Sequence, residues 1–274
     1  MDNLKIYCMC LENNYLDIVK KLNYIPVGLK NKNFSNEWLL DDTLENISEK
    51  NPYYGEYTFY YWYWKNILKK KEKDEWVGFC SYRELWGDNN NSPQKNSINS
   101  LLKSVPEQWY EYDAIIGEPT ILHRPKLTKI LKYGKISLLR NFKEIFNKKF
   151  SIKFHFDMFH GNGNLDKAIS VLPEKDKKDF RHFVENNHSF NQGNMFISKS
   201  SKVIDSYFND VFSWLKNCEE IFGFNLEGYN KIRMYTFLAE RYLPFWFKKN
   251  TKYLEWPVVH CDIYRNQEEL NVKN

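Results

Sequence analysis

Aromatic side chains and hydrogen-bonding groups crowd one window of the sequence, residues 46–83, and together they can do recognition chemistry. The aromatic set is Tyr53, Tyr54, Tyr57, Tyr60, Tyr61, Trp62, Tyr63 and Trp64. The polar set threaded through it is Asn46, Ser48, Asn51, Glu56, Thr58, Lys65 and Asn66. Such rings stack on the apolar faces of a sugar or nucleotide while the polar groups fix its orientation. The alternative interpretation is a buried aromatic helix whose polar tips find partners inside the protein.

A helix must position most of these groups. Pro52 suits a helix start and Gly55 suits a turn, so the sequence predicts a helix from Glu56 to about Lys70. At 3.6 residues per turn, apolar side chains occupy every face of this helix, which predicts burial on all sides. Buried polar groups need partners, and a ligand is one candidate partner.

Short β-rich runs alternate with helical segments in the first half of the chain. The expected strands are residues 4–10, 24–28, 76–82 and 112–117. This alternation predicts an α/β fold with a central mixed sheet flanked by helices. Ligands of such folds bind at the carboxyl ends of the strands, and the third run ends in Ser81, Tyr82 and Arg83.

The second half of the chain is expected to be mostly helical. The predicted elements are a strand over 191–198, an amphipathic helix over 200–222, a helix over 231–247 that breaks near Pro244, and an edge strand over 257–260. Residues 87–100 are expected to form a polar loop and residues 120–154 two short helices. The sequence contains no internal repeat, and its 274 residues suit one large domain, residues 1–274.

Composition bounds the partners and the compartment. A net charge of +5 allows anionic partners such as nucleotides or phosphates, but bases and acids are interleaved, so no nucleic-acid-binding face is expected. The five cysteines include no Cys-x-x-Cys and are expected to be reduced and buried, as in a cytoplasmic protein. The sequence opens without an apolar signal-peptide region and contains no run of 18 apolar residues, so no membrane span is expected.

Eight blocks of the sequence, in order, match the pattern of one family. They are residues 5–9, 24–28, 46–51, 56–66, 78–84, 112–115, 194–197 and 239–243. Through them the chain resembles the bacterial capsular and exopolysaccharide glycosyltransferases first catalogued as a domain of unknown function. The most specific blocks are Trp-x-Trp-Lys-Asn at 62–66 and Asn-Met-Phe-Ile at 194–197. The family's His-Tyr-Arg-Arg reads Ser81-Tyr82-Arg83-Glu84 here, which marks a divergent member.

The resemblance implies a fold similar to the GT-A type. It also implies transfer of a sugar from a nucleotide-sugar donor, a UDP-hexose such as a galactose-type one, to a growing surface polysaccharide such as capsule or lipopolysaccharide. Residues 1–119 would then form the α/β half that binds the nucleotide sugar, and residues 120–274 the acceptor-side half. The acceptor would be a saccharide or a lipid-linked saccharide, and residues 245–249 could touch the inner face of the cytoplasmic membrane peripherally.

Such a transfer needs a base and positive charge near the leaving group. Glu56 and Glu240 are the expected catalytic carboxylates, with Asp157 and His160 as further candidates for the base. Arg83 and Lys65 are the expected charges, with Arg233 and Arg241 as further candidates. The expected donor-binding residues are Asn46, Ser48, Asn51, Thr58, Trp62, Lys65, Ser81, Tyr82 and Arg83. Asn194 and His160 are expected to bind the acceptor.

A divalent cation, Mn²⁺ or Mg²⁺, is another way to neutralise the leaving group. No Asp-x-Asp follows a predicted strand, and Asp41 and Asp42 are adjacent, so their side chains would diverge in an extended segment. The sequence therefore assigns no metal ligands.

Two other functions compete with transfer. A non-catalytic carbohydrate-binding protein of the same fold would explain the departures at Ser81 and Glu84. Nucleic-acid binding would use the aromatic residues and the net positive charge, but the interleaved acids disfavour it. Turnover of a nucleotide sugar separates the first of these functions from a transferase.

Overall fold

A mixed β-sheet forms the centre of the computed structural model, which describes residues 3–29, 33–70, 74–88, 100–124 and 148–264. Its strands lie in the order β10-β6-β9-β4-β1-β2-β3. Their bounds are β1 Leu4–Cys10, β2 Ile25–Gly28, β3 Leu39–Leu40, β4 Trp76–Ser81, β6 Ala114–Gly117, β9 Phe196–Ser198 and β10 Tyr253–Trp256. The strands β3, β2, β1 and β4 are mutually parallel, whereas β9 runs antiparallel to both β4 and β6. The predicted α/β fold with a central mixed sheet is confirmed.

Two further antiparallel pairs border this sheet. The strand β5 (Glu84–Trp86) pairs with the end of β4 and with β11 (Val258–His260), while β7 (Pro119–Ile121) pairs with β8 (Ser189–Asn191). The segment expected as one strand over 191–198 is therefore divided into β8 and β9. Positive φ angles at Gly193 (+90°) and Asn194 (+52°) make the turn between them.

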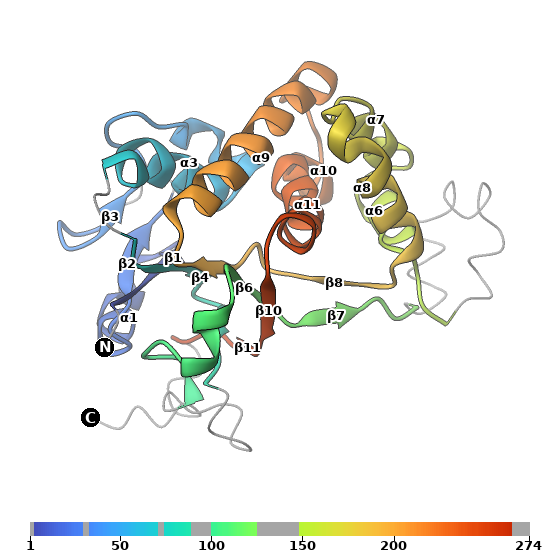
Figure 1. Ribbon diagram of the computed structural model, residues 1–274. Helices are drawn as coiled ribbons and strands as arrows, with labels where there is room; N and C mark the ends of the chain where they lie inside the picture. Colours follow the sequence, from blue (N-terminus) through green and yellow to red (C-terminus); the bar gives the residue numbers. More distant parts are fainter. Residues whose placement is uncertain (1–2, 30–32, 71–73, 89–99, 125–147, 265–274) are drawn as a thin grey trace.

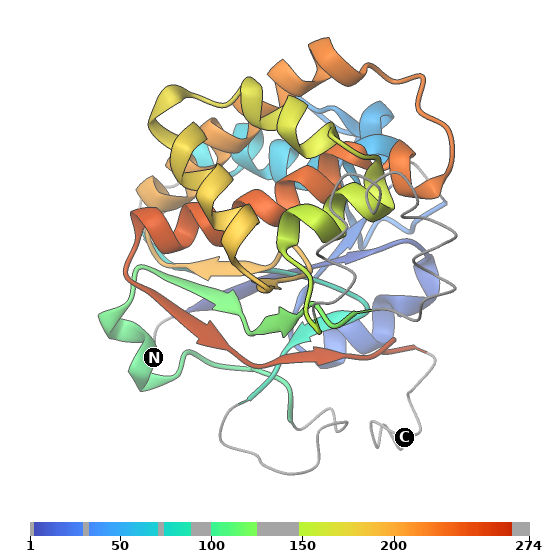
Figure 2. The same cartoon turned by 90° about the vertical axis from the view of Figure 1, so that its right-hand side faces the viewer.

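Helices cover one face of the sheet much more heavily than the other (Figures 1 and 2). On the covered face lie α3 Tyr57–Asn66, α6 Ile152–His160, α7 Asn164–Ser170, α8 Glu174–Asn186, α9 Ser201–Phe222 and α11 Met234–Asn250. The short helix α1 (Leu16–Lys21) lies on the opposite face. The sheet also takes β9 and β10 from beyond residue 119, so strands from both of the expected halves pair in it.

The strands separate two hydrophobic clusters, because side chains alternate between the faces of a sheet. On β1, Tyr7 and Met9 belong to the cluster under the large helices, whereas Ile6 and Cys8 belong to the cluster under α1. All five cysteines are free and buried, as expected. The predicted loop over 87–100 and the predicted helices over 120–154 fall mostly outside the described residues.

The aromatic helix is buried on every side, as its residue pattern predicts. Tyr57, Phe59, Tyr60 and Tyr63 are each 0% exposed. The helix is shorter than expected: α2 (Asn51–Tyr54) and a turn at Gly55 precede it, and a 3-10 turn over Leu68–Lys70 follows it.

The prediction of a helix break at Pro244 is wrong. The helix α11 continues through Pro244 to Asn250, and the helical segment is interrupted earlier, at Arg233, between α10 (Tyr229–Ile232) and α11. Proline removes one backbone donor to the residue four positions earlier. The surrounding core outweighs that loss, because α11 buries Leu243, Pro244 and Phe247.

Phe79 on β4 should be a centre of stability in the larger cluster. Its ring is fully buried, with ring centroids 4.7 Å from Tyr60, 5.2 Å from Tyr63 and 5.0 Å from Phe196. We expect Phe79→Ala to lower the free energy of unfolding by about 3–5 kcal/mol in urea titrations, because it leaves a cavity. Tyr110→Ala, at a ring that is 52% exposed, is the control and should cost less than about 1 kcal/mol. Equal losses would contradict this assignment.

Candidate active site

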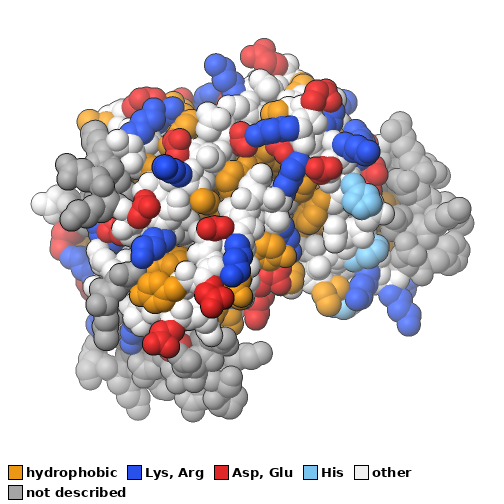
Figure 3. Space-filling model, viewed as in Figure 1, with side chains coloured by type: hydrophobic (Ala, Val, Ile, Leu, Met, Phe, Trp, Pro, Cys, Tyr) orange, Lys and Arg blue, Asp and Glu red, His pale blue; other side chains and the backbone are white. Residues whose placement is uncertain are grey.

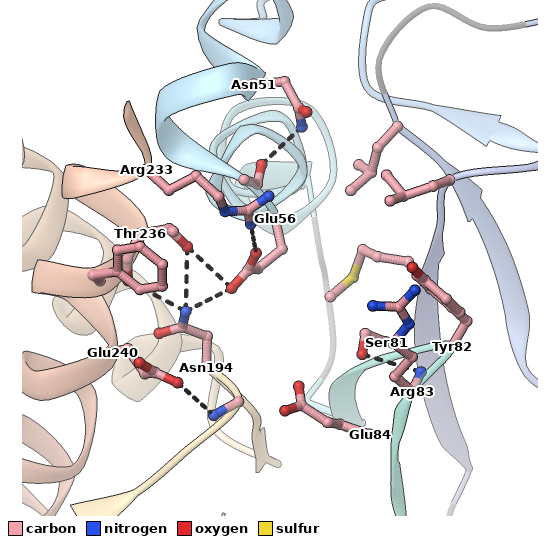
Figure 4. A pocket seen from close by; sticks show the side chains of 16 residues that line it. Asn51, Glu56, Ser81, Tyr82, Arg83, Glu84, Asn194, Arg233, Thr236 and Glu240 are labelled. Carbon is pink, nitrogen blue, oxygen red and sulfur yellow. Dashed lines mark hydrogen bonds and ion pairs between the residues drawn. The ribbon is translucent and has the colours of Figure 1, made fainter. Parts of the chain in front are cut away.

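A cavity of about 290 Å³ opens where the parallel strands β1, β2 and β4 end (Figure 4). Its lining residues are Met9, Leu11, Leu29, Asn51, Gly55, Glu56, Ser81, Tyr82, Arg83, Glu84, Gly193, Asn194, Arg233, Thr236, Phe237 and Glu240. They come from the strand ends, from the α2–α3 junction, from the β8–β9 turn and from the first turns of α11. The carboxyl ends of parallel strands are the usual ligand-binding edge of an α/β sheet.

The carboxylate of Glu56 joins three of these segments. Its Oε1 accepts hydrogen bonds from Asn194 Nδ2 at 2.5 Å and from Thr236 Oγ1 at 3.1 Å, and its Oε2 lies 3.3 Å from Arg233 Nη2. Both carboxylate oxygens are therefore engaged by protein groups (Figure 4). The side chain stays 21% exposed at the cavity wall, so a ligand can still reach it.

The turn at Gly55 aims Glu56 at the cavity. Gly55 has φ +58° and ψ −132°, a region in which a Cβ is strained. A Cβ here would also collide with Arg233 Nη2 and approach Thr236 Oγ1 to 3.1 Å. The backbone conformation thus favours glycine at this position, and an added methyl would also push the Arg233 guanidinium away from its place beside Glu56.

The fully buried Thr58 hydroxyl supports this turn from behind. It donates to Asp41 Oδ2 at 2.5 Å and accepts from Asn51 Nδ2 at 3.0 Å, and the same Asn51 amide donates to the Gly55 carbonyl at 2.9 Å. Burial raises the pKa of Asp41 to about 6, against the opposing effect of the Thr58 hydrogen bond. Thr58 therefore acts on the cavity through Asn51.

Tyrosines of α3 hold Asn194 in place from the core side. Tyr60 donates its hydroxyl to the Asn194 carbonyl at 2.6 Å, and Tyr57 donates to Asn194 Oδ1 at 3.3 Å. These contacts leave Asn194 Nδ2 directed at Glu56. Most of the aromatic helix thus packs behind the cavity, and on this side Asn51, Gly55 and Glu56, which precede the helix, line it.

Glu240 and Glu84 both lie close to Gly193. Glu240 Oε1 accepts from the Gly193 N–H at 3.1 Å, and Glu240 Oε2 is paired with the buried guanidinium of Arg241. A Cβ on Gly193 would come within 2.9 Å of Glu84 Oε2. Glycine at 193 therefore lets the backbone pass directly beside the Glu84 carboxylate.

The surroundings of Glu84 raise the pKa of its carboxyl group. Burial first, and then repulsion by Glu240 and Glu56, raise the pKa of Glu84 to about 7. Ser81 and Arg83 oppose the shift, and His260 Nδ1 lies 3.9 Å from Glu84 Oε1. A carboxyl group that titrates near neutrality can accept a proton from a substrate hydroxyl.

Arg83 and Tyr82 form the rim of the cavity. The Arg83 guanidinium lies 4.8 Å from the centre of the Tyr82 ring and its Nε lies 3.8 Å from Asp262 Oδ2, while its side chain is 60% exposed. A neighbouring cavity of about 260 Å³ shares Leu11, Tyr82 and Arg83 with the first and adds Tyr15 and Tyr264. The rim arginine thus stands between a carboxylate-lined space and an aromatic one.

The structure brings together many of the residues that the sequence predicts for the site. Those in the cavity lining are Asn51, Glu56, Ser81, Tyr82, Arg83, Asn194, Arg233 and Glu240. The other expected residues lie outside it. They are Asn46, Ser48, Thr58, Trp62, Lys65, Asp157, His160 and Arg241.

Local contacts explain where several of these residues lie. Asn46 Oδ1 accepts from the Ser48 N–H and hydroxyl, which fixes a turn, and Trp62 Nε1 donates to the Thr43 carbonyl. Lys65 Nζ lies 3.7 Å over the Trp64 ring, in a different cavity.

His160 and its neighbours pack in the interior. The His160 ring stacks on Phe237 with centroids 4.1 Å apart, and its Nδ1 lies 2.8 Å from the Asn230 carbonyl. Burial, together with the charge of Arg241, holds the pKa of His160 far below its ordinary value. Asp157 pairs with Lys153 at 3.2 Å.

Sequence reasoning does not assign Glu84, Gly193 and Thr236 to the site. Glu84 stands out in the sequence as a charge reversal within the Ser-Tyr-Arg-Glu block, and that departure is the signal that could have found it. Gly193 and Thr236 belong to the cavity because β9 and α11 return to the end of β4, and no local pattern in the sequence shows such a return.

The described residues contain no cluster of three or more His, Cys, Asp or Glu side chains that could hold a metal ion. The carboxylates of Glu56 and Glu240 are engaged by Arg233 and Arg241. Among the described residues, the protein groups present at the cavity thus do not form a ligand set for a metal ion.

The distribution of surface charge and the hydropathy of the helices bear on two expectations, those about nucleic acid and about the membrane. On the face shown in Figure 3, basic and acidic side chains are interspersed and do not form one basic patch. None of the helices in the described ranges is long and apolar enough to cross a membrane. In the 245–249 segment, Phe245, Trp246 and Phe247 are all buried, and Lys249 pairs with Asp176 at 3.0 Å.

Comparisons with known proteins define the family. Residues 5–251 match the family described as a domain of unknown function, DUF4422, and the chain belongs to that family. The fold is similar to that of a solved structure of the WbbM bifunctional glycosyltransferase in its apo form, with a TM-score of 0.62 and 19% sequence identity. The match covers 95% of this chain and 45% of that chain, so this chain spans less than half the length of the neighbour. No curated protein matches the chain.

Alanine at Gly55 should disturb the site as well as the fold. We expect Gly55→Ala to lower the free energy of unfolding by more than the roughly 1–3 kcal/mol of backbone strain alone, because the new methyl also displaces Arg233. Gly163→Ala is the matched control, since Gly163 also has a positive φ (+79°) but no atom lies within 4 Å of the place its new methyl would take. Chemical denaturation of both variants measures the difference, and equal losses would argue against a steric role for Arg233.

The raised pKa of Glu84 predicts a pH-dependent gain on neutralisation. A carboxyl whose folded pKa lies above its unfolded value stabilises the fold at low pH and loses that contribution as the pH rises through about 7. The free energy of unfolding of Glu84→Gln, relative to that of the parent, should therefore rise from pH 5 to pH 8 by on the order of 1–3 kcal/mol. Urea titrations at the two pH values measure this gain, with exposed Glu220→Gln as control. A difference that does not change with pH would rule out the raised pKa.

Proposed function

We propose that the protein is a glycosyltransferase that moves a sugar from a nucleotide-sugar donor to a saccharide acceptor. The observation that carries this proposal is the cavity at the ends of β1, β2 and β4, where carboxylates and arginines converge. A fold similar to that of a glycosyltransferase structure over 95% of the chain supports it. At 19% identity, that match supports the fold, and the activity is tested by the experiments below.

We expect the donor to lie across the two neighbouring cavities, with its nucleobase in the outer cavity and its sugar in the inner one. Tyr264, which is 43% exposed, offers a ring face to a nucleobase in the outer cavity, and the buried rings of Tyr15 and Tyr82 support it, with centroids 4.7 Å apart. The diphosphate would then lie at Arg83, whose guanidinium can form two hydrogen bonds to phosphate oxygens. The sugar would enter the inner cavity, beside Glu56, Asn194 and Glu84.

We assign the general base to Glu84. In the transfer step, an acceptor hydroxyl gives its proton to the Glu84 carboxylate while its oxygen bonds to the anomeric carbon of the donor. The bond from that carbon to the diphosphate breaks, its electron pair leaves with the diphosphate, and Arg83 meets the developing charge. The carboxylates expected for this role, Glu56 and Glu240, are held in ion pairs with Arg233 and Arg241.

Glu56 and Asn194 then serve to orient the sugar. Glu56 is fixed by three donors and remains 21% exposed, so it can accept a hydrogen bond from a sugar hydroxyl without rearranging. A UDP-hexose donor, a surface polysaccharide as the product and a cytoplasmic location belong to the same proposal. A carbohydrate-binding protein without turnover is the rival, and the Ser81 and Glu84 departures are the feature that favours it.

A panel of nucleotide sugars tests binding before chemistry. Each compound is added in a thermal-shift assay, with and without Mn²⁺ or Mg²⁺, and the true donor at about 100 times its Kd should add roughly 2.7 kcal/mol of stability. Arg83→Ala should reduce that shift, whereas Lys202→Ala, at an exposed residue on α9, should not. If no nucleotide sugar stabilises the protein, the proposed donor is wrong.

Turnover of the donor that binds then separates a transferase from its rival. Glu84→Gln should lower kcat by about 10²–10⁴-fold, the usual contribution of a general base, with little change in donor binding. Glu56→Gln and Glu240→Gln should cost less in kcat. Donor binding without transfer or hydrolysis in the parent protein would support the non-catalytic function, and an active Glu84→Gln variant would place the base elsewhere.

A further inference from the structure

A second cavity, of about 360 Å³, lies between α3 and α9, away from the candidate active site. We refer to it as the aromatic–lysine cavity. Its lining residues are Ile47, Lys50, Tyr54, Tyr61, Trp64, Lys65, Phe212, Ser213, Lys216 and Glu219. None of these residues lines the candidate active cavity. Figure 1 shows α3 and α9 side by side on the covered face of the sheet.

Rings held in fixed orientations form the floor of this cavity. Trp64 and Phe212 are stacked, with centroids 5.6 Å apart and planes 7° from parallel, and Tyr61 meets Phe212 edge-on at 5.3 Å. The Trp64 indole N–H donates to Asp205 at 2.7 Å, and Tyr61 donates its hydroxyl to Glu45 at 3.0 Å. The polar tips of both rings are therefore engaged with protein, and their apolar parts line the cavity.

In the lining of the cavity, positive charge exceeds negative charge, because Lys50, Lys65 and Lys216 stand against Glu219. Glu219 is the acidic residue of the lining, and it already accepts from Lys50 Nζ at 2.7 Å and from the Tyr54 hydroxyl at 2.7 Å. Lys65 lies with its Nζ 3.7 Å over the Trp64 ring, and Lys216 is exposed on α9. Burial and the neighbouring Lys69 lower the pKa of Lys65, against weaker attraction from Glu45 and Asp205. An anion placed here would relieve the repulsion between the lysines.

We infer that the aromatic–lysine cavity binds an acidic sugar residue, one bearing a carboxylate or phosphate, within a saccharide chain. The partly exposed ring of Tyr61 takes the apolar face of a sugar, Ser213 offers a hydroxyl, and Lys65 and Lys216 pair with the anionic group. The site is concave and close to the lower end of the volumes of small-molecule pockets, so it suits one sugar unit better than a flat bilayer surface.

This site goes beyond the proposed transfer reaction, since binding here needs neither a donor nor turnover. The helix α2 stands between the two cavities: Asn51, at its start, lines the candidate active cavity, and Tyr54, at its end, lines this one. A saccharide chain held here would touch the segment that leads into the Gly55 turn. The sequence block around Lys65 would then serve a remote saccharide contact in place of the expected donor contact.

The probe is a trimer of galacturonate, and its methyl ester is the uncharged control. Isothermal titration of the whole protein, with no nucleotide present, should show the acid binding at least about tenfold more tightly than the ester, and more weakly at high salt. Lys65→Ala and Lys216→Ala should each weaken binding of the acid by about tenfold. Lys202→Ala, on the same helix as Lys216, should leave that binding unchanged.

Three results would overturn the inference. One is equal binding of the acid and the ester, and another is binding that survives both lysine substitutions. The third is an anionic phospholipid vesicle that binds through Lys216 while the trimer does not, which would make the surface a membrane contact. A separate thermal-shift measurement on Lys216→Ala with nucleotide sugars distinguishes a failure of this inference from a failure of the proposed function. That variant should bind nucleotide-sugar donors as the parent does.

Discussion

The carboxylate of Glu56 is the contact on which the geometry of the cavity depends. It ties the end of α2, the β8–β9 turn and the start of α11 together through Asn194, Thr236 and Arg233. Glu56 and Asn194 lie 138 positions apart in the sequence. A half-buried carboxylate such as that of Glu56 benefits from these partners, because removing an isolated charge from water is costly. The same three contacts therefore stabilise the charge of Glu56 and hold the three segments of the site together.

The aromatic core makes that contact rigid. Tyr57 and Tyr60 place their hydroxyls on Asn194 while their rings pack against Phe212 and Phe79. Tyrosine serves here because one side chain fills core volume and also satisfies a buried polar group. A helix of leucines would have filled the space but left the Asn194 backbone carbonyl unsatisfied, and the polar turn could not then sit against the core.

The carboxylates of the cavity differ because their neighbours differ. Glu56 and Glu240 each lie against an arginine, whereas Glu84 is repelled by both of these acids and has Ser81, Arg83 and His260 as opposing neighbours. Environment, and not residue type, therefore separates orienting groups from a proton acceptor. The same logic separates two lysines of the aromatic–lysine cavity: Lys50 is neutralised by Glu219, while Lys65 faces Lys69 and an aromatic ring.

The sequence by itself determined the strands β1 and β4, the burial of the aromatic helix and the polar residues at the end of β4, since these follow from local periodicity and composition. It also placed Glu56, Asn194 and Glu240 among the candidates. Tertiary structure alone decided that α11 runs through Pro244, that Lys65 and Trp62 lie outside the cavity, and that Glu84 enters it. Those outcomes depend on which distant segments come into contact and on the charges of their side chains. Local spacing in the sequence does not show either.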